Sequence, residues 1–223
     1  MYRKKRITAV AMAAVLLALL GGCVNQFNAA GYTKALLDVT YKNETEQYIE
    51  LTGSTKEAAD QIFDKSLDIT MEDYEKLNLP DELEENYRKL FGDLMKSVRY
   101  TVAEAKEDDQ GNFTVDVSIE PITLFDDTYA QFQEQAKEYA SQVSNDVMNG
   151  AEMPSEEEMQ NHIYDLYYHI LNENLEKGLS YGEPETVTVH VNKGEEDIYE
   201  IPKEDMSQLD DKMLTREVLK NAD

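Results

Sequence analysis

The sequence is poor in the residues that cross-link or subdivide a folded chain. Its 223 residues include one cysteine, no tryptophan and five prolines, with no Gly/Ser-rich or Pro-rich linker and no internal repeat. A single cysteine excludes an internal disulfide, so the fold must be held by its core alone. The lack of linkers and repeats predicts one folded domain.

Basic residues are also scarce. The chain has 21 Lys and Arg against 46 Asp and Glu, which gives a net charge of −25. Residues 1–22 hold four basic and no acidic residues, so the remainder carries −29. Nucleic-acid binding requires clusters of Lys and Arg and is therefore excluded. We interpret the acidity as a source of solubility rather than as a specific cation-binding feature.

Motifs of catalytic and cofactor sites are absent from the sequence. There is no Gly-rich phosphate loop, GxSxG elbow, SxxK or HExxH motif. The acidic turns at 107–111 and 193–197 lack the ligand spacing of an EF-hand, so no dedicated calcium site is expected. The sequence therefore predicts no metal, no cofactor and no catalytic residue.

The amino terminus, by contrast, has three well-defined zones. A basic segment at 3–6 precedes an almost unbroken apolar run from Ile7 to Leu20, and Gly21 and Gly22 then lead to Cys23. This is the layout of a secretory signal, with an apolar core of about 7–15 residues. The run is too short for an ordinary membrane-spanning helix, which needs about 20 apolar residues.

The residues Leu20-Gly21-Gly22-Cys23 resemble the lipobox of bacterial lipoproteins. The resemblance implies that Leu20, Gly21 and Gly22 are recognised by the signal peptidase and that Cys23 receives a diacylglyceryl group. Two acyl chains suffice for stable anchoring to a membrane. This implies a location on the extracytoplasmic face of the cell membrane. The alternatives are a cleaved signal with a chance cysteine and an uncleaved short anchor.

Hydrophobic periodicity predicts both helices and strands in the rest of the chain. Apolar residues alternate at 98–102 and 113–119 around a Gly-containing turn, and again at 186–191 before a return at 198–201. We expect helices at 30–43, from the capping box Ser54–Glu57 onward, at 70–77, 80–94, 127–148, 155–178 and 203–214.

This order predicts an α+β fold. The two antiparallel hairpins would form a roughly four-stranded sheet, packed on one face against the helices and polar on the other. We expect residues 1–22 to be the lipoprotein signal peptide and 23–30 the lipidated cysteine with a short tether. Residues 31–215 would be a single α+β domain, and 216–223 a loose tail.

The stretch from Tyr32 to Leu209 resembles uncharacterised lipoproteins of clostridia and bacilli that carry domains of unknown function. The similarity lies in the segments 32–38, 48–63, 115–122, 187–189 and 199–202. Some such lipoproteins look like the cystatin-like or nuclear-transport-factor-like α+β roll. That resemblance implies a curved sheet and a cone-shaped pocket, and it implies no activity.

Histidines and tyrosines are the remaining candidates for a site. His162 and His169 are seven residues apart on one helix, about 10 Å along its axis, which favours helix-surface positions over a shared metal. His190 is expected on the polar face of a strand. The tyrosines either fill the core or line a groove for a peptide or glycan; those concerned are Tyr129, Tyr139, Tyr164, Tyr167 and Tyr168.

Three functional hypotheses are compatible with these features. The favoured one is a membrane-anchored, non-catalytic binding module of the cell envelope, with an envelope protein, peptide or glycan as its ligand. The alternative is an envelope hydrolase that uses a carboxylate pair and a histidine converging within about 3–9 Å in a pocket. A ligand sensor that presents a cleft to a membrane partner is the third.

We expect Cys23→Ser to release the processed chain from the membrane, because serine has no thiol to accept the diacylglyceryl group. Fractionation of cells into membrane and soluble proteins measures this, and incorporation of labelled palmitate into the wild type is the positive control. A processed variant that stays with the membranes would contradict the anchor.

Overall fold

The computed structural model describes residues 27–194 and 198–214, apart from the side chains of residues 73–75. The predicted signal peptide and Cys23 lie outside these ranges. The chain forms two compact units, each built from discontinuous segments. Unit 1 joins the described residues up to Glu72 with Met95–Pro121 and Glu183–Met213, and unit 2 contains Asp73–Leu94 and Ile122–Gly182. The predicted α+β class is confirmed, whereas the predicted domain boundaries and the cystatin-like roll stay predictions.

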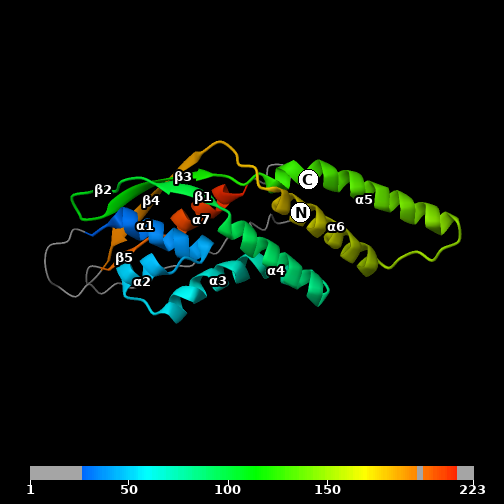
Figure 1. Ribbon diagram of the computed structural model, residues 1–223, viewed down its shortest axis with the longest axis horizontal. Helices are drawn as coiled ribbons and strands as arrows, with labels where there is room; N and C mark the ends of the chain where they lie inside the picture. Colours follow the sequence, from blue (N-terminus) through cyan, green and yellow to red (C-terminus); the bar gives the residue numbers. More distant parts are fainter. Residues whose placement is uncertain (1–26, 195–197, 215–223) are drawn as a thin grey trace, which may run out of the picture. The chain divides into compact units, whose positions relative to one another are not determined.

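Unit 1 is built on one antiparallel sheet with the strand order β1-β3-β4-β5, while β2 pairs with β3 beyond the end of β1 (Figure 1). The two predicted hairpins therefore join through β3 and β4 into a single sheet. The strands are β1 (Arg99–Val102), β2 (Lys106–Glu107), β3 (Phe113–Glu120), β4 (Glu185–Lys193) and β5 (Tyr199–Glu200).

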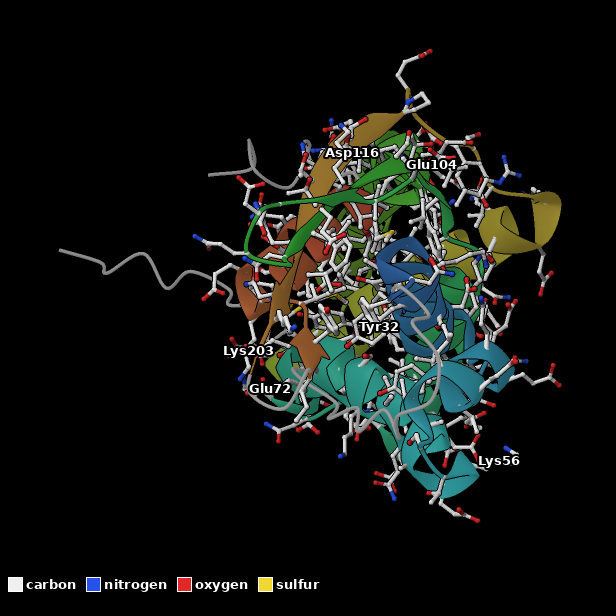
Figure 2. The ribbon with its side chains drawn as sticks, turned by 90° about the vertical axis from the view of Figure 1, so that its left-hand side faces the viewer. Tyr32, Lys56, Glu72, Glu104, Asp116 and Lys203 are labelled. Carbon is white, nitrogen blue, oxygen red and sulfur yellow. The ribbon has the colours of Figure 1, made fainter. Side chains whose placement is uncertain are left out.

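The register of β3 and β4 gives the sheet one apolar and one polar face. Val115 pairs with Val189 and Val117 with Val187, and all four side chains are buried. The pair between them, Asp116 and Thr188, lies on the opposite face, where the Thr188 hydroxyl donates to the Asp116 carboxylate at 2.7 Å. Figure 2 shows Asp116 on this outer face and Tyr32 of the first helix on the inner side. The predicted polar face is confirmed.

Helices cover the apolar face of this sheet. Tyr32 and Ala35 of α1, and Met206 and Leu209 of α7, are buried in the core. A smaller apolar cluster joins α1, η1, α2 and α3. The helical elements of unit 1 are α1 (Ala29–Leu37), the π-helix η1 (Asp38–Lys42), α2 (Glu46–Thr52), α3 (Lys56–Glu75, in unit 1 as far as Glu72) and α7 (Lys203–Met213).

Two predicted helix starts are wrong in detail. The Ala58 amide donates to the Thr55 hydroxyl at 3.2 Å, so Thr55 rather than Ser54 caps α3. Thr70 does not begin a separate helix, because its hydroxyl donates to the carbonyl of Ser66 inside α3. A Ser or Thr hydroxyl can bond to the carbonyl four residues back, which leaves a helix unbroken.

A buried carboxylate connects η1 to the sheet. The Asp38 side chain is only 4% exposed and accepts a hydrogen bond from the Tyr100 hydroxyl of β1 at 2.6 Å. The Lys34 ammonium also donates to it, and the Lys42 ammonium lies 3.8 Å away and over the Tyr100 ring. A buried charge is tolerated only with such partners.

A second carboxylate, Asp210 of α7, accepts a hydrogen bond from the Tyr41 hydroxyl of η1. Burial raises the pKa of Asp210, the Tyr41 hydrogen bond lowers it by less, and the charge of Asp211 adds to the increase. Burial also raises the pKa of Tyr41 well above its usual value, so the hydroxyl keeps its proton and acts as the donor.

Unit 2 is helical and contains α5 (Leu124–Met148), α6 (Glu156–Lys177) and most of α4 (Asp81–Lys96). The apolar residues that follow β3 do not extend that strand. The strand ends at Glu120 and α5 begins four residues later. Ile122 instead forms an isolated antiparallel bridge with Tyr181, which joins the ends of the α5–α6 segment.

We expect Asp210→Asn to change how stability depends on pH. Because the folded state holds the Asp210 proton more tightly than the unfolded chain, wild type loses stability as pH rises from the ordinary carboxyl value through the raised one. Asparagine can still accept from Tyr41 and has no such loss. Urea unfolding between about pH 3 and pH 7 should therefore show the variant gaining on wild type as pH rises.

Asp146→Asn, at an exposed position on α5, is the matched control and should show no comparable trend. If the stability of Asp210→Asn relative to wild type stays constant or falls as pH rises, the raised pKa of Asp210 is contradicted.

Candidate functional site

The helices α5 and α6 run side by side as a long antiparallel hairpin (Figure 1). A capping box at Ser155 begins α6, in agreement with the helix predicted at 155–178. The Glu158 amide donates to the Ser155 hydroxyl at 3.1 Å, and the Ser155 amide donates to the Glu158 carboxylate at 2.7 Å. Gly150, with φ of 95°, allows the chain to turn after α5.

A groove of about 250 Å³ lies between these two helices. Phe132 and Tyr167 approach each other across it, with ring centroids 4.7 Å apart. The Tyr87 hydroxyl of α4 donates to the Tyr164 carbonyl at 2.7 Å and so holds this part of α6. We name this groove, lined by Tyr129, Phe132, Ile163, Tyr164 and Tyr167, the aromatic groove.

The aromatic groove is accessible because its lining is only half-buried. All five lining residues have intermediate exposure, unlike Ile170 and Leu171 further along α6, which are buried. At the other end of the hairpin, Met148 is 75% and Met153 58% exposed. An exposed apolar stretch on a folded protein commonly marks an interaction surface.

Three of the five tyrosines singled out from the sequence meet in this groove: Tyr129, Tyr164 and Tyr167. Tyr139 instead stacks on His162 with ring centroids 3.9 Å apart. Tyr168 packs edge-on against Tyr87, and burial raises the pKa of its hydroxyl. Phe132 and Ile163 also line the groove, and helical periodicity does not distinguish such residues from core residues.

All three histidines are exposed. His162 and His169 lie on the surface of α6, as the helix-surface interpretation predicts, and His169 lies 3.5 Å from Asp165. His190 lies on the exposed face of β4, as predicted, and its Nδ1 is 2.9 Å from the Asp205 carboxylate.

The Asp205 carboxylate is buried at the start of α7 and also accepts from the His190 backbone amide at 2.7 Å. The Asp205 carboxylate thus accepts from a backbone amide of β4 at a residue that is not paired with β5, because β5 pairs with β4 only at Asn192 and Lys193. This double contact gives Asp205 a structural role, which its sequence position in a helical first turn did not reveal. The aromatic groove is lined by no histidine and no acidic residue, so it does not provide the convergence that the hydrolase hypothesis requires.

The described residues hold neither a cluster of metal ligands nor a membrane-spanning helix. Within residues 27–194 and 198–214, no three His, Cys, Asp or Glu side chains cluster closely enough to hold a metal ion. In the acidic turn after β2, the Asp108 carboxylate accepts from the amides of Gln110 and Asn112, and the Asn112 bonds lower its pKa. Of the helices in the described ranges, none has the length and apolar character needed to cross a bilayer.

We expect the methionines at the hairpin end to contribute little to folding. Met148→Ser and Met153→Ser should each change the free energy of unfolding by less than about 0.5 kcal/mol, as is typical of surface sites. Leu171→Ala, at a fully buried position of α6, should lower it by about 2–5 kcal/mol. Urea unfolding monitored by circular dichroism measures both, and a large loss in either serine variant would contradict the exposure of these side chains.

No protein-family model matches the chain, and no curated protein matches it. The fold is similar to the crystal structure of a candidate lipoprotein, ycdA, of Bacillus subtilis, with a TM-score of 0.59 and 15% sequence identity. The match covers 86% of this chain and 57% of the other, so this chain spans little more than half the length of that protein. At this identity the likeness shows a shared fold and nothing about shared activity.

Proposed function

We propose that this chain is a lipid-anchored protein of the cell envelope that acts as a non-catalytic interaction module. Cys23 carries the diacylglyceryl anchor, which holds the protein on the extracytoplasmic face of the membrane. The aromatic groove and the exposed end of the α5–α6 hairpin form its contact surface.

Two independent observations support the anchor. The first is the lipobox Leu20-Gly21-Gly22-Cys23 behind a basic and apolar start, which is a sequence feature. The second is the fold, because the similar structure from Bacillus subtilis is itself described as that of a candidate lipoprotein. Because the identity is low and that protein is longer, its partners and role are not transferred to this chain.

The half-buried aromatic lining of the groove is the observation that carries the interaction role. Tyrosine offers a large apolar ring with a hydroxyl that can reach a partner or water, which is why it is enriched at interfaces. Phe132 and Ile163 add apolar area beside three such rings. A groove of this kind suits a partner that inserts apolar side chains.

The residues of the aromatic groove do not favour the hydrolase alternative. It needs two acids and a histidine that converge in a pocket. Among the described residues the three histidines are exposed, and the aromatic groove contains no histidine or acid. No described geometry therefore favours catalysis over binding.

A photoreactive amino acid at position 132 tests the contact surface in the full-length, membrane-anchored protein. If the aromatic groove contacts a partner, illumination of living cells should produce a discrete cross-linked species from position 132. The same photoreactive residue at position 144, which is exposed elsewhere on α5, should not produce it.

Cross-linked species that are identical at the two positions would contradict a specific contact at the groove, as would the absence of any species from position 132. Reproducible turnover of an envelope substrate by the purified protein would overturn the non-catalytic role.

A further inference from the structure

The α5–α6 hairpin has an apolar seam that the described residues cover only in part. Apolar residues recur at intervals of three or four along both helices, which places them on one face of each helix. Most of them remain half-buried, because two helices cover only part of an apolar seam. The seam comprises Phe132, Ala136, Tyr139, Val143 and Val147 on α5 and Met159, Ile163 and Leu166 on α6.

The charge of the hairpin restricts what can cover this seam. From Leu124 to Lys177 there are twelve Asp and Glu and two Lys, which gives a net charge of −10. Eleven of the twelve acids are exposed, and Asp126 has intermediate exposure. Lys177 lies 3.4 Å from Glu173 on the same helix, so it is already engaged in an ion pair.

A second copy of this chain is a poor occupant of the seam for that reason. Packing two hairpins together would bring two surfaces of −10 within one Debye length, about 8 Å at physiological salt. A cationic partner would instead gain from the same field, both in approach and in the bound complex.

The shape of the groove favours a helix over a glycan. Two antiparallel helices pack about 8–10 Å apart and present a channel that the side-chain ridge of a third helix can fill. The five groove residues supply apolar rings and an aliphatic side chain, with only tyrosine hydroxyls for hydrogen bonding. A glycan, which is rich in hydroxyl groups, would need more polar partners than this lining provides.

We infer that the aromatic groove receives an amphipathic helix of a partner protein, with one apolar face and Lys or Arg along its flanks. This inference rests on the proposed function and specifies the partner's chemistry. The bound helix would pack beside α5 and α6, with its apolar face on Phe132 and Ile163 and its cations in the field of the hairpin's exposed acids.

Three synthetic peptides of about 20 residues, long enough to form a helix on binding, test this with the purified full chain in detergent. One is an amphipathic helix with leucines on one face and lysines elsewhere. The second has the same composition in scrambled order, and the third has glutamate in place of lysine. Fluorescence anisotropy at about 0.15 M salt should show the first binding at least about tenfold more tightly than either of the others.

Variants locate the binding site on the chain. Phe132→Ser and Ile163→Ser keep the charge and should each weaken binding of the first peptide by about tenfold. Ala140→Ser, at an exposed position of α5, is the matched control and should bind like wild type. The double variant Glu134→Lys and Glu138→Lys changes only exposed residues, so it should fold normally and still weaken binding several-fold.

Equal binding of the ordered and scrambled peptides, with no effect of the groove variants, would overturn the inference by showing attraction through charge alone. Tighter binding of the glutamate peptide would also overturn it. If position 132 cross-links to a glycan or to an uncharged protein segment, the proposed function stands and this inference fails. If position 132 gives no cross-link and no peptide binds, both fail.

Discussion

Strand β3 is the element on which the rest of unit 1 depends, because it hydrogen-bonds to β1, β2 and β4. A strand places alternate side chains on opposite faces, so the positions of apolar and polar residues along it are fixed by which face is buried. Val115, Val117 and Ile119 are fully buried, and the intervening residues are not. A register shift by one residue would place threonine and aspartate against α1 and α7. Pairing of β3 with strands far apart in the chain therefore fixes the sheet's apolar face and, with it, the positions of both helices.

Tyrosine hydroxyls make several of the long-range polar links in this chain, whose single cysteine permits no internal disulfide. Tyr41 donates to Asp210, Tyr100 donates to Asp38, and Tyr87 donates to the Tyr164 carbonyl, each across more than sixty residues of sequence. In each case a large apolar ring fills space and its hydroxyl satisfies a buried or half-buried acceptor. An unpaired buried carboxylate would be strongly unfavourable, so these bonds also select the fold in which the partners meet.

Local patterns predicted much of the secondary structure. The alternation at Phe113–Ile119 and the capping box at Ser155 both correspond to observed elements, because each depends on neighbouring residues alone. The short helix α2, the π-helical geometry at Asp38 and the buried role of Asp205 were not predicted. Each depends on contacts with residues distant in sequence, which a local window does not contain. The groove was foreseen only as one use of the tyrosines, since periodicity placed Phe132 and Ile163 in the core.

The hairpin shows why an apolar stripe does not by itself reveal function. The stripe on α5 and the buried stripe on β3 both predict a covered face, yet among the described residues the first is only half-buried and the second is fully buried. Apolar surface left exposed to water costs about 25 cal/mol per Å², so an accessible aromatic stripe is tolerated rather than stabilising. The dense negative charge around this stripe opposes association between copies of the chain. In the interaction that we propose, a partner of opposite charge would cover the half-buried apolar seam of this acidic hairpin.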